Sequence, residues 1–242
     1  MSSLAEEIEE EARRLDDPER ERQLKRYFRE PIEAYGLTMA QSRELAKKYY
    51  PRVKGDLDAA MSLAETLLKT GNLTLAGVGL GILDRFRRKL GPQHLDTFDG
   101  WVDHLSNWAT TDTLATHMIA ASVAGDPSQV GRLMEWTGSG NRWRRRAAAV
   151  SLVPPARRGL LLEEVFILSD RLMEDEDDMV QKGVGWLLKE APGGGPRLPP
   201  QVEGPGPSPG AQVCIRETAQ GAAGPQDKGL AQCFMLPLHN FF

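Results

Sequence analysis

The chain has 242 residues, 40% of them hydrophobic, which is enough for one good-sized core with or without an appendage. An acidic, polar N-terminus and the lack of any apolar run of about 18 residues argue against a signal peptide or a membrane span, so we expect a cytoplasmic protein with no membrane partner. Two cysteines exclude a disulfide framework, and a formal net charge of −4 disfavours nonspecific attraction to nucleic acid.

Amphipathic helices are expected from residue 2 to about residue 192, because apolar residues recur there at three- and four-residue spacing. No segment has a convincing strand pattern. The breakers between the helices include the pair Pro154–Pro155. The expected helices span 3–15, 18–30, 39–50, 56–70, 73–90, 92–106, 108–124, 127–137, 141–153, 159–173 and 177–191. Pairs of segments recur at roughly 35 to 40 residues, which favours an all-α, HEAT-like α-helical repeat array (α-solenoid) over a compact bundle.

The character of the chain changes after Pro192, where the stretch GGGPRLPPQVEGPGPSPG is dominated by glycine and proline. Such a composition cannot sustain a helix or bury a core, so we predict a disordered tail. The chain thus divides into a helical repeat domain, 1–192, and a tail, 193–242. Alternatively, this tail is not the natural continuation, because a frameshifted reading frame would also stop the helical pattern in mid-array.

The stretch HLSNWATTD contains a tryptophan and an aspartate one helical turn apart, Trp108 and Asp112. On a regular helix turning about 100° per residue, these two share a face that lies about 120° from the apolar Leu114 and Met118. A plainer interpretation is that Trp108 is half-buried core and that Asp112 is the N-cap of a helix beginning at Thr113. Spacing alone favours the plainer interpretation.

Arginines are concentrated in and around the stretch NRWRRRAAAV, which has a predicted apolar stripe of Trp143, Ala147 and Val150. A short span whose only acidic residue is Glu135 contains Arg132, Arg142, Arg144, Arg145, Arg146, Arg157 and Arg158. This distribution predicts a local basic surface inside an acidic protein, and guanidinium groups suit phosphate oxygens. Residues 144–146 fan over about 200°, so at most two can face one ligand. The alternative is a solvated, salt-bridged face.

The stretch DMVQKGVGWLLKEAP predicts a helix with a narrow apolar stripe and Trp186 projecting about 150° away from it, beside Lys182 and Lys189. Gly183 and Gly185 each cost about 1 kcal/mol relative to alanine in a helix, which a close backbone approach would have to offset. Alternatively, Trp186 packs on a neighbouring helix. The stripe consists of Val180, Val184, Leu187, Leu188 and Ala191.

Other common chemistries lack their sequence signals. The four histidines, His94, His104, His117 and His239, show no metal-ligand spacing. Phosphate-cradling glycine loops and nucleophile elbows are absent, and the stretch MEDEDDMV is most simply an acidic first helical turn. Metal, nucleotide and serine-hydrolase chemistry are therefore disfavoured.

Three motifs in one order and spacing, WVDHLSNWATTD, SGNRWRRRAAAVSL and DDMVQKGVGWLLKEAP, resemble the AlkD-like DNA glycosylases of the DNA alkylation repair family, which are built on HEAT-like repeats. The resemblance covers about residues 5–192. It implies a monofunctional alkylpurine DNA glycosylase of base excision repair, a hydrolase that releases N3- or N7-alkylated purines from duplex DNA without a metal or other cofactor. Further helices follow the last motif in the family, so the resemblance also implies a truncated or replaced C-terminus here. We expect a monomer.

By motif position, the resemblance implies a role for each of several residues. Asp112 matches the catalytic aspartate, which would stabilise an oxocarbenium-like sugar and position water. Trp108 and Trp186 match lesion-contacting aromatics. The pair Arg145 and Arg146 contains the DNA-contacting arginine, and Arg142 and Lys182 are further DNA-binding candidates.

Two other functions remain open from the sequence. One is a non-catalytic HEAT-like scaffold that binds nucleic acid or protein through the same face. The other is a degenerate or truncated paralogue with little activity. The direction of the Asp112 carboxylate relative to the two tryptophans would discriminate the enzyme from the scaffold.

Overall fold

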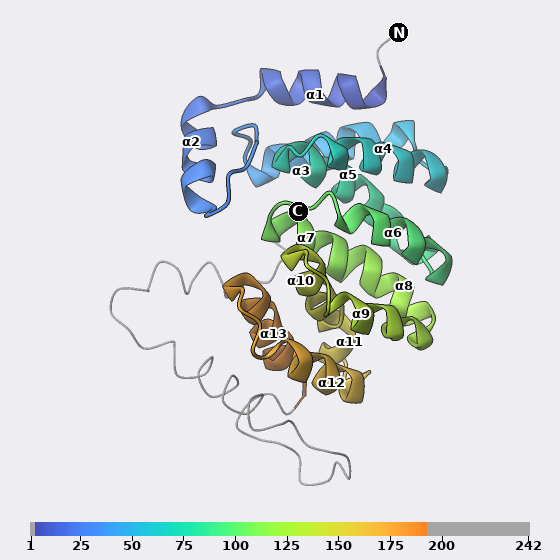
Figure 1. Ribbon diagram of the computed structural model, residues 1–242. Coiled ribbons are helices and arrows are strands. Elements are labelled where there is room, and N and C mark those ends of the chain that lie inside the picture. The colour runs from blue at the N-terminus through green and yellow to red at the C-terminus, as the bar shows by residue number, and fades with distance from the viewer. Residues whose placement is uncertain (1–2, 193–242) are drawn as a thin grey trace.

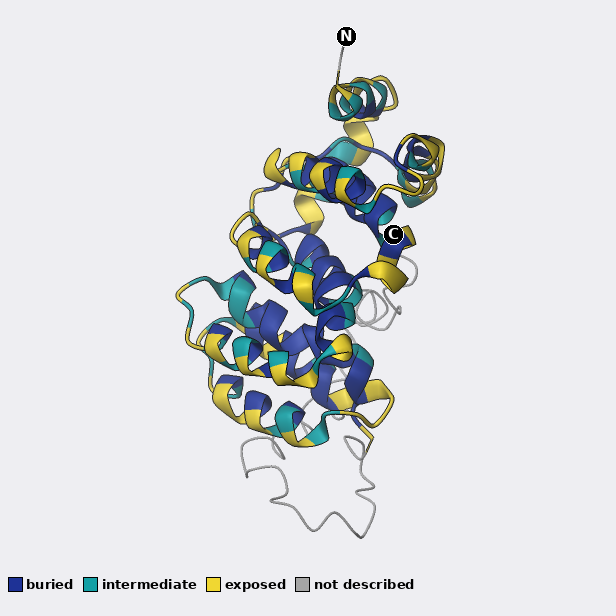
Figure 2. Ribbon diagram, turned by 90° about the vertical axis from the view of Figure 1, so that its right-hand side faces the viewer, coloured by how far each residue is buried: buried dark blue, intermediate teal, exposed yellow. Residues whose placement is uncertain are grey.

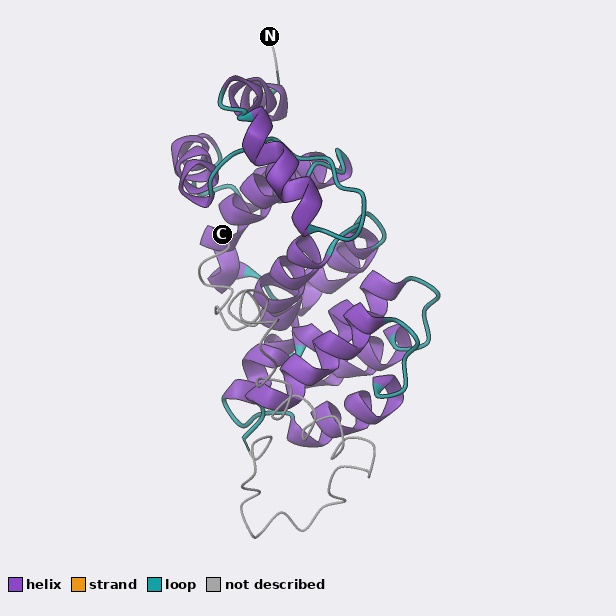
Figure 3. Cartoon of the chain, turned by 90° about the vertical axis from the view of Figure 1, so that its left-hand side faces the viewer, coloured by secondary structure: helices purple, strands orange, loops and turns teal. Residues whose placement is uncertain are grey.

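The computed structural model describes residues 3–192, and throughout that range the chain forms helices joined by turns and loops (Figure 3). The expected all-α fold is confirmed. Within residues 3–192, the only β-type pairing is an isolated parallel bridge between Glu33 and Asn72. The predicted tail and the frameshift hypothesis concern residues outside the described range.

The α-helices are α1 (Leu4–Arg14), α2 (Pro18–Tyr27), α3 (Met39–Tyr49), α4 (Leu57–Lys69), α5 (Leu73–Leu83), α6 (Leu95–Val102), α7 (Trp108–Thr113), α8 (Ala120–Gly125), α9 (Val130–Trp136), α10 (Arg142–Ser151), α11 (Val153–Arg157), α12 (Leu162–Leu172) and α13 (Asp178–Glu190). Short 3₁₀ helices are η1 (Tyr50–Arg52), η2 (Asp84–Lys89), η3 (Pro92–His94) and η5 (Pro127–Gln129), and η4 (Leu114–Ile119) is a π-helix.

The helices are stacked in two rows (Figure 1). The first row consists of α4, α6, α9 and α12, and each of these packs against the helix that follows it in the second row. The second row consists of α3, α5, the continuous run α7–η4–α8, α10 and α13, in which successive members are neighbours. First-row helices begin at Leu57, Leu95, Val130 and Leu162, so the repeat is 32 to 38 residues long. This arrangement is the helical repeat array expected from the sequence.

Most second-row helices begin at a side chain suited to capping. Asn72, Asn107, Asn141 and Asp177 precede α5, α7, α10 and α13, and each side chain accepts a hydrogen bond from a first-turn backbone N–H. Such caps satisfy donors that have no partner inside the helix and contribute about 1 kcal/mol each. The starts of the helices that contain the candidate site residues are therefore fixed by local sequence.

Buried residues lie along the helices through the middle of the stack, and exposed residues lie mainly on its outside (Figure 2). Trp101 and Phe98 of α6 are among the largest fully buried side chains. The predicted apolar stripes of α10 and α13 are confirmed, since all of their members are buried: Trp143, Ala147, Val150, Val180, Val184, Leu187, Leu188 and Ala191.

Helix α2 lies beside the stack and has no buried residue of its own (Figure 1). The segment that follows it contains Phe28, Ile32 and Ala34, which form a small separate core with Ala109. Two ion pairs join this segment to distant helices, Arg29 with Asp178 at 2.8 Å and Glu30 with Arg142. The N-terminal segment is thereby held against the far end of the array.

The expected helix over 108–124 forms, but it is not regular. A π-helical turn, η4, interrupts it, and the hydroxyls of Thr111, Thr113 and Thr116 donate to the carbonyls of residues four positions earlier. Threonine hydroxyls bonded in this way compete with the helical pattern and bend helices. The assumption of 100° per residue through this segment was therefore wrong beyond Leu114.

Several boundaries also differ from expectation. The helix expected over 18–30 ends at Tyr27, and the one expected over 73–90 is α-helical only to Leu83. Two further differences have a clear backbone cause. Residues Pro154–Pro155 do not end a helix but lie in the first turn of α11, where the missing N–H of proline costs no intrahelical hydrogen bond. Helix α12 starts at Leu162 rather than residue 159, because Leu161 has a left-handed backbone with φ of 58°. Left-handed backbone cannot continue a right-handed helix.

Gly183 lets α13 approach α10 closely. A Cβ placed at this position would lie 3.3 Å from Cγ of Arg146 and 3.3 Å from Cγ1 of Val150. The close approach offsets the helix-propensity cost of this glycine, as the sequence analysis required.

We expect Gly183→Ala to lower the free energy of unfolding by about 1 to 2 kcal/mol, because overpacking against a fixed neighbour outweighs the gain in helix propensity. Chemical denaturation measures the change. Gly131→Ala in α9 is the matched control, since a Cβ there would meet nothing within 4 Å, and it should not destabilise the protein. Equal stability of the two variants would contradict the close packing at Gly183.

Candidate active site

The Asp112 carboxylate forms a buried, two-pronged ion pair with the Arg146 guanidinium. Arg146 donates from Nε to Oδ1 at 2.8 Å and from Nη2 to Oδ2 at 2.7 Å. Only 3% of the Asp112 side chain and 6% of the Arg146 side chain are exposed. The fork of two parallel bonds joins α7 to α10 and fixes the orientation of both groups.

This pair also reaches the third helix. Nη1 of Arg146 donates to the backbone carbonyl oxygen of Met179 in α13. Burial raises the pKa of the Asp112 carboxyl, and the neighbouring Arg146 charge opposes that effect. Asp112 of α7 is thus held by an arginine of α10 that also bonds to α13, so one side chain joins three successive elements of the second row. The cap of α7 is Asn107, so the interpretation of Asp112 as an N-cap was wrong.

Trp108 lies one turn before Asp112 and is partly buried, as the plainer interpretation expected. Its ring stacks on Phe28 with centroids 5.3 Å apart and meets the edge of Tyr27 at 6.1 Å. Tyr27 is 40% exposed. Sequence reasoning missed Tyr27 and Phe28, because nothing in the sequence pairs the end of α2 with a tryptophan eighty residues later. The two residues complete an aromatic cluster with Trp108, which lies one helical turn before Asp112.

Trp186 lies on α13 and is also partly buried. Its indole N–H donates to Oε1 of Glu190 at 3.4 Å, and the same carboxylate pairs with Arg157 at 2.8 Å. Burial acts to raise the pKa of Glu190, but the Arg157 ion pair and the indole bring it below its ordinary value. Trp186 therefore has its own polar partner on α13, whereas Trp108 belongs to the aromatic cluster.

The expected basic surface does not form from the arginine run, because acids from other elements pair with each of its four members. Arg142 pairs with Glu30 and Asp177, and its guanidinium lies 4.4 Å from the Trp143 ring centroid. Arg144 pairs with Asp99 and Asp103 of the α6 end. The alternative of a solvated, salt-bridged face is correct in its ion pairs but wrong in its solvation, because the side chains of Arg144, Arg145 and Arg146 are largely buried. Counting acids within one stretch of sequence could not reveal partners from elsewhere in the chain.

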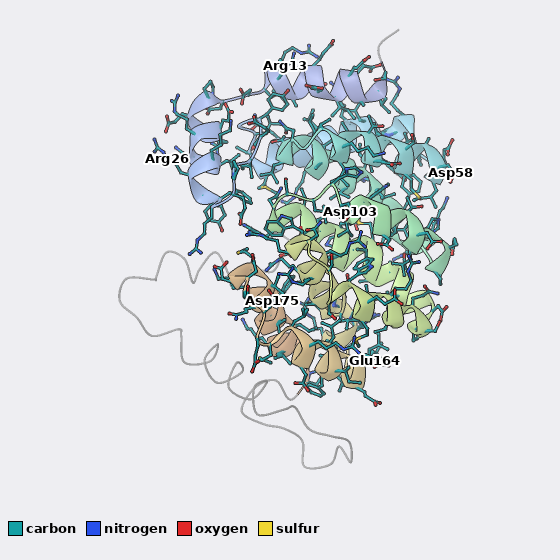
Figure 4. The ribbon with its side chains drawn as sticks, in the orientation of Figure 1. Arg13, Arg26, Asp58, Asp103, Glu164 and Asp175 are labelled. Carbon is teal, nitrogen blue, oxygen red and sulfur yellow. The ribbon has the colours of Figure 1, made fainter. Side chains whose placement is uncertain are left out.

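Arg145 and Lys182 are paired as well. Arg145 donates to both carboxylate oxygens of Asp175, at 2.6 Å from Nε and 3.0 Å from Nη2, beside the start of α13 (Figure 4). Lys182 lies 3.1 Å from Asp178 one turn earlier in its helix. Every DNA-binding candidate from the sequence thus has a carboxylate partner inside the molecule, which a phosphate would have to replace.

Two further properties of the described residues bear on the class of site. Among residues 3–192, no group of three or more His, Cys, Asp or Glu side chains is arranged to hold a metal ion. In the same range, no helix has the length and apolarity needed to cross a bilayer.

Comparison with known proteins supplies a family. A family model described as DNA alkylation repair enzyme matches residues 8–193. Among solved structures, a predicted DNA alkylation repair enzyme from Enterococcus faecalis is similar, with a TM-score of 0.65 and 15% sequence identity, covering 90% of this chain and 97% of that chain. At this identity the likeness concerns the fold. No curated protein sequence matches the chain.

The Arg145–Asp175 pair makes stability depend on pH in a defined direction. Burial acts to raise the pKa of Asp175, but the Arg145 ion pair and the Asp177 N–H outweigh it, so the pKa lies below its ordinary value of 3.8. A lowered folded-state pKa contributes stability above the unfolded value, and this contribution is lost as pH falls through the folded value. We therefore expect Asp175→Asn to destabilise the protein at neutral pH, with a deficit that shrinks below about pH 4.

Urea unfolding across a pH series measures the deficit. In an Arg145→Gln background, Asp175→Asn should lower the free energy of unfolding at neutral pH much less than it does in the wild-type protein, because the charge partner of Asp175 is gone. A deficit that stays constant or grows on acidification would refute this account of the pair.

Proposed function

The chain belongs to the family of DNA alkylation repair enzymes, and we propose that it acts as a monofunctional DNA glycosylase on N3- and N7-alkylated purines. The partner is duplex DNA containing alkylated bases, and the reaction is hydrolysis of the N-glycosidic bond by a monomeric protein in the cytoplasm. The observation that carries the proposal is a single buried carboxylate, Asp112, held in fixed orientation one helical turn from an aromatic cluster.

The chemistry of the substrate matches such a site. A purine alkylated at N3 or N7 already bears a positive charge, so it is a good leaving group and needs no general acid. The remaining task is to stabilise an oxocarbenium-like sugar and to position water, and one oriented carboxylate can do both. Aromatic faces attract a cationic base, which supports a lesion-contacting role for Trp108 and Trp186.

Arg146 is a positioning residue in this proposal. Its fork holds both Asp112 oxygens, and its third bond to Met179 anchors the guanidinium to α13. Since only 2% of Asp112 is exposed, the proposal requires the pair to open toward the damaged nucleotide. A guanidinium released in this way is suited to a phosphate oxygen, which links the pair to the DNA-contacting arginine implied by the family resemblance.

The burial of Asp112 favours a second candidate function, a non-catalytic scaffold that binds nucleic acid or protein. In that case the ion pair is purely structural, and the pairing of Arg142, Arg145 and Lys182 leaves little charge for DNA. Base release separates the two functions, because a scaffold releases none.

We expect wild-type protein to release 3-methyladenine and 7-methylguanine from methylated duplex DNA, and Asp112→Asn to slow release by about 10²- to 10³-fold. Mass spectrometry of the freed bases is the measurement. Asp99→Asn is a matched control that removes another arginine-paired carboxylate and should keep wild-type activity. Asp112→Asn leaves Arg146 buried without its charge partner and therefore destabilises the protein. The Asp112→Asn/Arg146→Met variant removes both charges, so it should be more stable than Asp112→Asn and should still lack activity. Release by a folded Asp112→Asn variant at the wild-type rate would sink the catalytic assignment.

The role of Trp186 can be tested separately. A cation–π contact of about 0.5 to 2 kcal/mol with the base, which is cationic while bonded to the sugar, predicts that Trp186→Leu lowers kcat/KM for excision of 7-methylguanine by roughly 2- to 30-fold. Trp186→Phe keeps an aromatic face, so its kcat/KM should lie between the values for wild type and for Trp186→Leu. If the leucine variant matches wild type in steady-state kinetics, Trp186 has no contact with the lesion.

A further inference from the structure

A pocket outside the candidate active site opens along the second row of helices. Its volume is about 280 Å³, and it is lined by α3, α5, η2, α7 and η4. The α5 lining includes Gly77 and Gly81, which have no side chains to fill the space. Thr113, which also lines the pocket, follows Asp112 directly in the chain. The pocket therefore adjoins the helix that carries the candidate catalytic carboxylate.

Basic side chains predominate among the charged groups of the pocket. Arg43 and Lys47 of α3 and Arg85 of η2 line it, against the carboxylates of Glu44 and Asp84. Lys47 is 67% exposed, and its contact with Glu44 at 3.6 Å is a surface pair of little energetic value. The Arg85 guanidinium lies over the Tyr50 ring at 5.0 Å, a contact that leaves its N–H groups able to donate.

The charge of Asp84 is already neutralised. Arg87 donates to both of its oxygens, at 2.7 Å from Nε and 2.8 Å from Nη2, and Nδ1 of His117 lies 2.9 Å from Oδ1. Burial acts to raise the pKa of Asp84, but His117 and Arg87 together hold it below its ordinary value, so the carboxylate accepts both contacts. With Asp84 matched by these partners, the remaining charge in the pocket is positive and favours an anionic ligand.

The position of the pocket identifies the anion. Thr113 at the end of α7 and His117 in η4 both line the pocket, so it lies along the same continuous helical run as the candidate carboxylate. A strand that presents a damaged nucleotide at α7 would therefore place a neighbouring phosphate near the pocket. Arginine, lysine and serine, which line the pocket as Arg85, Lys47 and Ser42, are donor types that contact DNA backbones. The π-helical turn that contains His117 is of a kind found frequently at functional sites.

We propose that this pocket binds a phosphodiester group of the DNA strand a few nucleotides from the lesion, through Lys47 and Arg85. The proposal rests on the proposed function insofar as DNA is the substrate. The pocket positions the duplex and takes no part in the chemical step, because its lining does not include Asp112.

The test is DNA binding at several salt concentrations between about 50 and 200 mM, with a short undamaged duplex as the probe. The Lys47→Gln/Arg85→Gln variant should bind more weakly, and the slope of log affinity against log salt should fall by about 2. Lys54→Gln/Lys69→Gln, which removes the same charge from exposed positions near α4 and within it, is the control and should keep the wild-type slope. Circular dichroism of each variant checks that folding is intact.

Base release distinguishes failure of the pocket from failure of the glycosylase. In an active protein, the pocket variant should raise KM and leave kcat unchanged. If wild type releases no base, but the salt slope falls in the pocket variant and not in the control variant, the pocket proposal is supported and the proposed glycosylase reaction is contradicted. If wild type releases bases and the pocket variant keeps its slope, the pocket proposal is overturned. It is also overturned if wild type binds no DNA. The same holds if the salt slope falls in the pocket variant only when an RNA duplex replaces the DNA duplex as the probe.

Discussion

The ion pair between Asp112 and Arg146 is the contact on which the centre of the array depends. Removing two charges from water is costly, and the cost is offset only when geometry is good and the remaining hydrogen-bonding groups are satisfied. Both conditions are met, because the guanidinium binds both carboxylate oxygens and the Met179 carbonyl. One buried arginine thereby sets the spacing of α7, α10 and α13, and Gly183 provides the room that its side chain needs.

The same interaction links stability to the proposed chemistry. Electrostatic stabilisation of a developing sugar cation requires an oriented carboxylate that can reach the sugar, and the Arg146 fork orients Asp112 but also keeps it buried. Burial alone would favour the protonated acid, and the Arg146 charge opposes that tendency. Opening the pair toward DNA would supply a carboxylate for the sugar and a guanidinium for a phosphate from one contact. Structural pairing and a role in repair are thus compatible for these two residues.

Charge elsewhere is distributed so that the arginines hold the molecule together. Glu30 from the segment after α2, Asp99 from α6 and Asp175 from the loop before α13 all meet arginines of α10. The pocket between α3, α5 and η4 differs, because its own acid Asp84 is neutralised by Arg87 and His117. In our proposal, a DNA strand therefore meets the cations of this pocket, in the N-terminal half of the second row, and it meets Arg146 of the arginine run only when the buried pair opens.

The sequence by itself determined the helices, their order and their buried stripes, because apolar spacing and capping residues such as Asn141 and Asp177 act within a few positions along the chain. The three motifs also pointed to the family that the comparisons then supplied. Long-range pairing was decided only by the tertiary structure. Nothing local to Asp112 encodes Arg146 thirty-four residues later, and nothing local to the arginine run encodes Glu30. Burial and ion pairing depend on which helices become neighbours, so the site's electrostatics could not be predicted from periodicity along the chain.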